Sequence, residues 1–489
     1  MSMSLILAVL ALVPRPQKVV ENGGTTVNVK VTNVADDRIP SEGYRLKVTV
    51  DGVTVWSSDA AGKFYAQETL KQLSAVDDKG RASLPLVEIE DAPRYKWRGV
   101  HFDDCRHFFG KETLKQTMDL MAQHKLNVLH WHLTEDQGWR LDIPGHPELV
   151  KYGAVRPQSV RHGCCAWTGD KEDADKFNGV KYGPFYYTEA DVKEILAYAA
   201  ERQIKVIPEI ELPGHAQALL AAHPEFACQP GNVAARAPRI TWGISKDVLC
   251  LGNDAAIRFY EEILDYVCKV FPSDVVHIGG DECPQERWKT CPKCQARIKK
   301  EGLKDEHDLQ PWVTRHFIDF LAKRGRRTIG WDEYLLGDVP PSAIGMRWRV
   351  GGGGAGHKCL TAREWIEKGH DMVMTPFSHC YLDYGQGLKD DPFQYIGGNL
   401  PLETAYALDP CEGIPENLRS HVLGGQGNNW SEYTWNECDL QWKMWPRMCA
   451  LAEVFWTGEK RPGFADFKVR MKTHRSRLIG QRVNCAPIE

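Results

Sequence analysis

The sequence predicts an α/β protein in which a (β/α)8 TIM barrel follows a small α+β domain. Eight short apolar runs, separated by longer helical or loop segments, predict the barrel. A turn-rich stretch of β-branched residues before them predicts the small domain, and acidic residues at the ends of the runs predict a site. The runs begin at Arg98, Leu126, Ile204, Asp274, Arg327, Ala343, Asp371 and His421.

The composition is that of a globular protein without an electrostatic signature for a polyanionic partner. The 489 residues include 61 Lys and Arg against 65 Asp and Glu, which gives a formal charge of −4, and 43% are hydrophobic. These values exclude a disordered chain or a coiled coil. Because nucleic acids and anionic membranes are bound by basic patches, a neutral small molecule or polymer is the expected partner.

Changes in sequence texture divide the chain into four parts. Residues 1–13 contain an apolar run of the length of a signal core, so they are a remnant of an export signal or an added segment. Residues 14–93 alternate in the runs VNVKVTNV, YRLKVTV and GVTVWSS and include a helical stretch at 67–73. The barrel is expected over residues 94–460 and a closing helix within 461–489.

The helical segments between the runs have core-facing stripes. In residues 111–124, Leu114, Met118 and Met121 recur at helical spacing, and residues 190–203 have a similar pattern. We assign these stripes to packing rather than to function.

Carboxylates mark the C-terminal ends of the runs, where the loops of a TIM barrel build the active site. We therefore expect a pocket that is rich in acidic side chains. The residues concerned are Asp103, Glu135, Asp136, Glu209, Glu211, Asp281, Glu282, Asp332, Glu333 and Asp383.

The central motif is HIGGDE, in which a β-branched run ends in two glycines and two acids, Asp281 and Glu282. Neighbouring residues of a strand point to opposite faces, so both acids enter one pocket only where the backbone turns. Adjacent carboxylates repel, and their pKa values should separate to leave one protonated near neutral pH. A helix-capping or surface pair is the usual alternative for such a dipeptide, but its place after the fourth run favours catalysis.

Three tryptophans, Trp331, Trp348 and Trp430, lie at or just after predicted barrel strands. A single tryptophan is more often a core residue. Three at strand ends, together with carboxylates, fit a sugar ring, which presents C–H groups on its faces and hydroxyls around its edge.

Seven motifs in order carry a resemblance to the β-N-acetylhexosaminidases of glycoside hydrolase family 20. They are WRGVHFDDCRHF, KLNVLHWHLTEDQGWR, VIPEIELPGH, HIGGDE, GWDE, YLDYGQG and GGQGNNWSEY. The combination of the second with HIGGDE is highly specific. The resemblance extends from about residue 14 to the final helix.

The resemblance implies roles for the acid pair. Glu282 matches the general acid/base, and Asp281 matches the carboxylate that orients the 2-acetamido group of the substrate. In this family the acetamido oxygen attacks the anomeric carbon, and water opens the resulting oxazolinium ion with net retention.

The resemblance also implies substrate-binding and supporting residues. Glu135 stands where the family usually has Asp, which adds a methylene to the side chain. By resemblance, Tyr381 donates to the acetamido oxygen, and the sugar is enclosed by Trp331, Trp348 and Trp430. The resemblance further implies that Arg98 binds the sugar and that Asp383 and Glu432 accept from its outer hydroxyls. The acid is supported, by the same resemblance, by His215, Glu135 and Asp136.

The expected function is that of an exo-β-N-acetylhexosaminidase that removes terminal β-linked GlcNAc or GalNAc from glycans, without a cofactor or metal. Alternatives are a relative that releases a disaccharide such as lacto-N-biose, a catalytically silent glycan-binding barrel, and a conventional retaining glycosidase with its own nucleophile. No nucleic acid and no membrane span are expected. The sequence does not determine sugar preference or oligomeric state.

Fifteen cysteines favour an oxidising compartment, so we expect a secreted or periplasmic protein. Cys283, Cys291 and Cys294 form a C-x7-C-x2-C pattern. For these three the sequence leaves a disulfide, free thiols and a zinc site open, because no fourth ligand can be identified.

Overall fold

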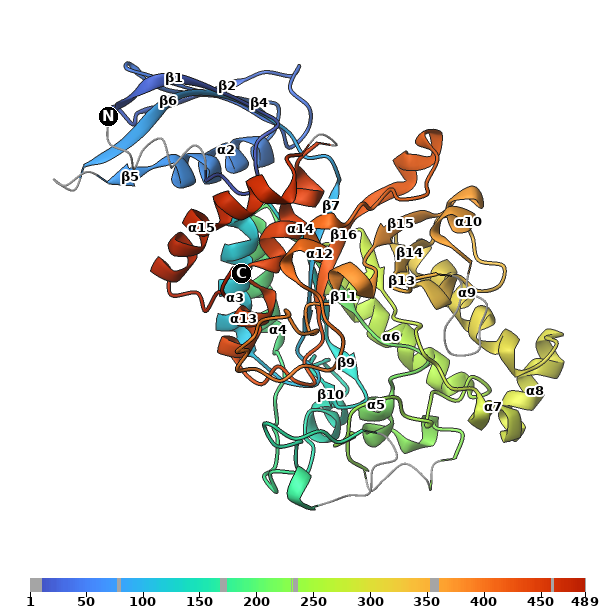
Figure 1. The fold of residues 1–489 in the computed structure, drawn as a ribbon. Helices are drawn as coiled ribbons and strands as arrows, with labels where there is room; N and C mark the ends of the chain where they lie inside the picture. Colours follow the sequence, from blue (N-terminus) through green and yellow to red (C-terminus); the bar gives the residue numbers. More distant parts are fainter. Residues whose placement is uncertain are drawn as a thin grey trace.

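The computed structural model describes residues 11–76, 81–167, 174–229, 231, 236–351, 360–458 and 461–488. Eight parallel strands form a closed barrel (Figure 1). Each predicted run overlaps one of them, which confirms the barrel. The strands are β7 (Trp97–Asp103), β8 (Val128–His132), β11 (Lys205–Glu209), β12 (Val275–His277), β13 (Arg327–Trp331), β14 (Ile344–Arg347), β15 (Asp371–Met374) and β16 (Val422–Asn429).

The barrel closes where β16 pairs with β7 in parallel register, Gly424 opposite Trp97 and Asn429 opposite Phe102. Inside it, β-branched side chains from successive strands form a buried layer that includes Ile207, Val275 and Ile329. Such residues suit strands that are buried on both faces, which explains why the runs read as continuous apolar stretches.

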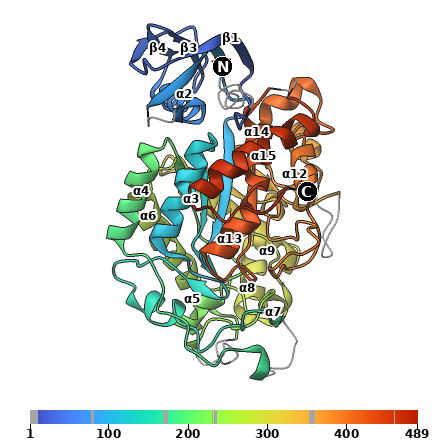
Figure 2. The same ribbon diagram turned by 60° about the vertical axis from the view of Figure 1, so that its left-hand side comes forward.

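Helices pack around the outside of the barrel (Figures 1 and 2). On α3, Leu114, Met118 and Met121 are buried, as their spacing predicts. The longer helices are α3 (Gly110–Gln123), α4 (Glu189–Glu201), α6 (Asp254–Val270), α8 (Pro292–Glu301), α9 (Leu309–Ala322), α13 (Glu437–Met444), α14 (Arg447–Trp456) and α15 (Phe464–Gly480). Shorter ones are α5 (Gln217–Ala222), α7 (Glu286–Thr290), α10 (Ala362–Glu367), α11 (Phe377–Cys380) and α12 (Leu402–Ala407).

The small domain is a sheet with the strand order β1-β6-β3-β4-β2, covered on one face by α2 (Ala60–Leu73). This confirms the predicted α+β class. The helix starts earlier than residue 67, because Asp59 caps it by accepting from the backbone of Gly62. The strands are β1 (Lys18–Thr26), β2 (Val31–Ala35), β3 (Tyr44–Thr49), β4 (Gly52–Ser57), β5 (Ala75–Val76) and β6 (Ala82–Asp91).

The two domains share buried contacts. Trp456, at the end of α14, lies in the apolar core of the small domain and donates its indole N–H to Asp91 at 2.9 Å. Lys125, before β8, forms a buried ion pair with the same carboxylate at 2.7 Å. Leu12 and Val13 are also buried, so the end of the predicted leader is part of this packing.

Figure 1 places the small domain at one end of the barrel and the short strands β9 (Thr134–Glu135) and β10 (Gly138–Trp139) at the other. β9 and β10 follow the C-terminal end of β8, so the catalytic face of the barrel points away from the small domain. No helix in the described ranges has the length and apolarity that a membrane crossing requires.

Candidate active site

The acid pair lies in a tight turn immediately after β12. Gly279 has φ of +64°, and a Cβ atom there would lie 1.7 Å from an oxygen of Glu211. Only glycine fits this position. Glu282 itself has φ of 45°, an uncommon conformation for a residue with a side chain. The turn therefore breaks the strand alternation, as the two glycines predict.

His215 brings the two acids into one compartment. Its Nε2 atom lies 3.7 Å from Oδ2 of Asp281 and 3.9 Å from Oε2 of Glu282. The side chain of Asp281 is 13% exposed and that of Glu282 33% exposed, so Glu282 is the more accessible of the two. The two carboxylates therefore share His215 as a neighbour and face the same space.

Burial and like charges make both acids hold protons more tightly. Burial first, and then the neighbouring carboxylates of Glu333 and Glu282, raise the pKa of Asp281 to about 7, against the opposing effect of His215. The same causes raise the pKa of Glu282. The pair therefore retains a proton near neutral pH, which a general acid requires.

Glu333 supports Glu282 from behind. One of its oxygens accepts from the backbone N–H of Glu282 at 3.4 Å and pairs with the guanidinium of Arg349. The other accepts from the indole of Trp348 at 2.9 Å. These contacts connect the acid to the wall of the pocket. A cavity of about 670 Å³ opens beside Glu282 and is lined by Glu333 and Arg349 as well.

Glu135 is a buried connecting residue rather than a pocket wall. It lies 2.6 Å from Nδ1 of His215 and 3.0 Å from the guanidinium of Arg106. Burial opposes its ionisation, but Arg106 and His215 outweigh burial and hold the pKa of Glu135 well below its ordinary value. Asp136 is buried too and accepts from the backbone N–H groups of Gln217 and Ser245, so it fixes two loops.

The carboxylate of Glu135 and that of Asp281 also determine the charge of His215. Burial disfavours the imidazolium form, yet these carboxylates raise the pKa of His215 well above its ordinary value. The ring is therefore positively charged at neutral pH.

The predicted aromatic residues form a continuous group at the barrel mouth. The ring centroids of Trp331 and Trp430 are 5.5 Å apart, those of Trp430 and Tyr381 6.4 Å, and those of Tyr381 and Trp348 6.3 Å. Trp331 is almost fully buried, whereas Trp348 and Trp430 are only partly buried. Trp331 thus forms a floor, and the other two offer open faces.

A buried carboxylate holds the floor in place. Glu209, inside the barrel, accepts from the indole of Trp331 at 2.8 Å, and its oxygens lie 2.9 Å from Nε2 of His130 and 2.9 Å from Nδ1 of His277. Burial opposes ionisation, but the surrounding histidines hold the pKa of Glu209 well below its ordinary value. The sequence identifies Glu209 as a strand-end acid, and the structure gives it this anchoring role.

Asp383 and Glu432 have buried carboxylate oxygens that find no partner among the described residues. Burial first, and then the charge of Glu432, raise the pKa of Asp383 to about 8. Arg106 lies 3.9 Å from Glu432, and its guanidinium is 5.0 Å from the ring of Trp430. Acceptors without partners beside an arginine fork can bind the hydroxyl groups of a sugar.

Comparisons with known proteins identify the family. A family model described as "Glycosyl hydrolase family 20, catalytic domain" matches residues 95–459, and one described as "Glycosyl hydrolase family 20, domain 2" matches residues 7–92. The chain belongs to glycosyl hydrolase family 20. The resemblance in the sequence motifs is thereby confirmed.

Individual relatives in family 20 agree. A β-hexosaminidase of Porphyromonas gingivalis is 40% identical over 91% of this chain, which spans 55% of that protein's length. A crystal structure of a β-N-acetylhexosaminidase is 32% identical, with a TM-score of 0.84, over 96% of this chain and 95% of that one. The structure of an exo-β-N-acetylglucosaminidase from Vibrio harveyi, in complex with N-acetylglucosamine, is 26% identical to this chain. The match has a TM-score of 0.85 and covers 98% of this chain and 78% of that one.

One predicted site residue of this family 20 chain lies elsewhere. Arg98 is at the start of β7, at the end of the barrel that faces the small domain, and its side chain is fully buried. It pairs with Glu42 at 2.9 Å and donates to the backbone carbonyls of Tyr95 and Lys125. The assignment of Arg98 to sugar binding is therefore wrong, because the barrel strand separates it from the pocket.

Arg106 is the arginine that reaches the family 20 pocket, and the sequence analysis missed it. It follows β7 by three residues, next to Glu135, Glu432 and Trp430. The signal was present in the motif WRGVHFDDCRHF, whose two arginines flank the strand. Since TIM-barrel sites lie after the C-terminal strand ends, the second arginine is the one expected there.

Proposed function

We propose that this chain is a retaining exo-β-N-acetylhexosaminidase that hydrolyses terminal β-linked GlcNAc or GalNAc by substrate-assisted catalysis. The observation that carries the proposal is that two consecutive acids, Asp281 and Glu282, meet the same histidine at 3.7 and 3.9 Å. Carboxylates this closely tethered are poorly placed to flank a glycosidic bond on opposite sides, as a separate acid and nucleophile must.

In the proposed reaction Glu282 gives its proton to the glycosidic oxygen as the bond to the anomeric carbon breaks. The carbonyl oxygen of the substrate's own 2-acetamido group forms the new bond to that carbon, which yields an oxazolinium ion. Asp281 accepts from the acetamido N–H and stabilises the positive charge. Water then attacks the anomeric carbon, and Glu282 takes its proton, so the configuration is retained.

The proposed scheme requires that Asp281 is ionised and Glu282 is protonated once the substrate is bound. A developing cation next to Asp281 favours its ionised form, in addition to the contribution of His215. The proton that the buried pair retains is then assigned to Glu282, the more exposed of the two acids, which donates it to the glycosidic oxygen. Burial first, and then nearby charges that include those of Asp281 and Glu282, raise the pKa of Tyr381. Its hydroxyl therefore stays protonated and is suited to donate to the acetamido oxygen.

Residues away from the acid pair, around Asp383 and Glu432, support the recognition of a terminal sugar. Asp383 and Glu432 have buried oxygens without partners in the described structure, and Arg106 lies beside Glu432. Groups that bind the outer hydroxyls of a ring leave no room for a further sugar on that side, so exo action follows. The sugar face would lie over Trp430 and the exposed part of Trp348.

The names of relatives point to the same substrate class. The Vibrio harveyi structure holds N-acetylglucosamine, and another relative from that organism is named N,N'-diacetylchitobiase. A glycan or oligosaccharide with a terminal N-acetylhexosamine is therefore the proposed substrate of this chain.

The test compares chromogenic β-glycosides that differ in the 2-substituent. We expect hydrolysis of the GlcNAc and GalNAc glycosides and loss of cleavage for the glucoside and the N-deacetylated glucosaminide, because these lack the internal nucleophile. Equal rates on the plain glucoside would contradict substrate assistance and favour an enzymic nucleophile. Rapid release of lacto-N-biose, with no action on the GlcNAc glycoside, would instead contradict exo action on single sugars.

A further inference from the structure

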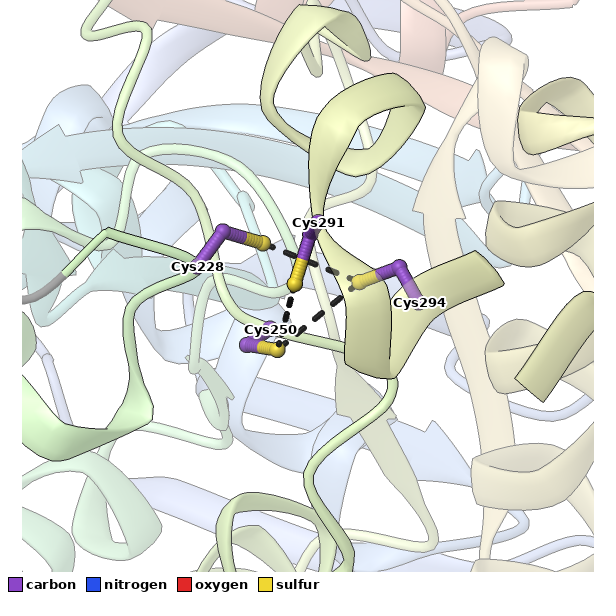
Figure 3. Close-up of side chains that lie close together, drawn as sticks. All are labelled: Cys228, Cys250, Cys291 and Cys294. Carbon is purple, nitrogen blue, oxygen red and sulfur yellow. Dashed lines mark hydrogen bonds between the residues drawn. The ribbon is translucent and has the colours of Figure 1, made fainter. Parts of the chain in front are cut away.

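Four cysteines from two segments of the chain lie close together (Figure 3). Cys228 and Cys250 come from the segment between β11 and α6, and Cys291 and Cys294 from the segment around α7 and α8. Cys283 is not among them, so the sequence pattern C-x7-C-x2-C does not describe this group. The ligands Cys228 and Cys250, distant in sequence, are the ones that sequence analysis could not supply.

The sulfur atoms have the spacing of a tetrathiolate metal centre. The distance from Sγ of Cys294 to that of Cys228 is 3.6 Å and to that of Cys250 3.7 Å, and Cys250 is 3.7 Å from Cys291. All four lie within 4.8 Å of one another. Four sulfurs at about 2.3 Å from a tetrahedral zinc ion are about 3.8 Å apart. A disulfide would instead bring two of them to about 2.05 Å.

The backbone around the group is shaped to hold it. Ala227 and Leu249 form an antiparallel bridge, so Cys228 and Cys250 lie diagonally across it with their side chains on the same face. A Cβ atom on Gly252 would lie 2.1 Å from the backbone of Lys293, which shows how closely the two segments approach. Cys291 and Cys294 have the two-residue spacing of a zinc knuckle.

The surroundings fit a structural rather than a catalytic ion. Cys250, Cys291 and Cys294 are buried, and Cys228 is half-buried. The indole of Trp288 donates to the backbone carbonyl of Leu249 beside the group at 2.9 Å. Four protein ligands leave no position for water or substrate, as in closed zinc sites.

We propose that Cys228, Cys250, Cys291 and Cys294 bind one zinc ion that fastens the loop after β11 to the loop after β12. Thiolates are the ligands, so binding displaces the thiol protons to solvent. Residues Glu286 and Lys289 of α7 line the cavity beside Glu282, and α7 leads directly into Cys291. The ion therefore fixes one wall of that cavity.

Other cysteines provide a contrast. The structure describes fourteen of the fifteen cysteines, and all fourteen are free thiols, while Cys359 lies outside the described residues. Cys268 on α6 is partly buried, like Cys228, but does not belong to the group. Cys438 is exposed and also outside it. These two are the control positions.

The experiment measures metal by elemental mass spectrometry in the full chain, purified without a metal-affinity column or chelator. We expect about one zinc per chain, falling below about 0.1 in the double variant Cys228→Ser/Cys294→Ser. The control double variant Cys268→Ser/Cys438→Ser should keep its zinc. Zinc retained by the first variant, or a wild-type chain that cannot be loaded with zinc, would overturn the proposal.

A second measurement needs no variant and so does not depend on folding. Titrating wild-type thiols with an organomercurial in the presence of a zinc indicator should release one zinc per chain. The cobalt-substituted protein should show thiolate-to-cobalt charge-transfer absorption. Non-reducing peptide mapping that finds Cys228, Cys250, Cys291 or Cys294 in a disulfide would contradict the zinc site, and so would stoichiometric iron in place of zinc.

Discussion

Nδ1 of His215 lies 2.6 Å from Oε1 of Glu135, while the other nitrogen of the ring faces Asp281 and Glu282. The buried carboxylate therefore keeps a positive charge next to the acid pair. That charge lowers the pKa of both acids and partly offsets the effect of their burial. The pH range of activity depends on this histidine as much as on the acids.

Replacing His215 with Asn should move the pH profile. Removal of an opposite charge at this distance raises the pKa of Asp281 and Glu282, so both limbs of the profile of kcat/KM should shift to higher pH by about one unit. The rate at pH 6 should fall about 10–100-fold. A profile that is lowered without a shift would assign His215 a structural role alone.

Glu282→Gln should reduce kcat by about 10²–10⁴-fold on a substrate with a poor leaving group, because proton donation is lost. On a dinitrophenyl glycoside, which leaves without protonation, formation of the intermediate should be nearly normal. Asp281→Asn is the matched control, since its defect should not depend on the leaving group. Equal losses of Glu282→Gln on both substrates would argue against its role as the acid.

Arg106 and Arg98 should have opposite mutational effects. Arg106→Lys keeps the charge but loses the forked donors, so kcat/KM should fall about 10–100-fold. Arg98→Ala breaks a buried pair with Glu42 and should lower the free energy of unfolding by about 3 kcal/mol, with an unchanged KM in the folded fraction. Thermal melts and steady-state kinetics on both variants measure these effects. A raised KM in Arg98→Ala would contradict the position of Arg98 outside the pocket.

The acid pair should reduce stability near neutral pH. Asp281 has a folded-state pKa of about 7, above its ordinary value of 3.8. The proton bound to Asp281 therefore stabilises the folded state fully at low pH, and this stabilisation is lost as the pH rises through 7. Asp281→Asn should therefore gain about 4 kcal/mol relative to wild type between pH 4 and pH 8. The measurement is Tm against pH, with the exposed Asp338→Asn as control. A gain of the same size in the control would point to net charge instead.

Much of the fold could be predicted from the sequence because the barrel strands are short apolar runs separated by longer helical or loop segments. The strand β1 was not predicted, since its residues are mostly exposed and its register shifts between Glu21 and Thr25. The acid pair was predictable because its glycines and its position after a strand are local features.

Other parts of the site depend on contacts that the sequence does not reveal. Arg98 and Arg106 lie eight residues apart, and only the direction of the strand between them decides which one reaches the pocket. The cysteine group joins positions up to 66 residues apart. Export of the chain stays a prediction, since the described cysteines form no disulfide that would support it.

Trp456 closes the core of the small domain, although it belongs to the last helices of the barrel, and Asp91 of the small domain neutralises Lys125 of the barrel. A barrel cut free at residue 93 would expose that indole and leave a lysine ammonium without its counter-ion. Because the contacts between the two domains are buried, we expect the domains to unfold together and the barrel to be unstable without the smaller one.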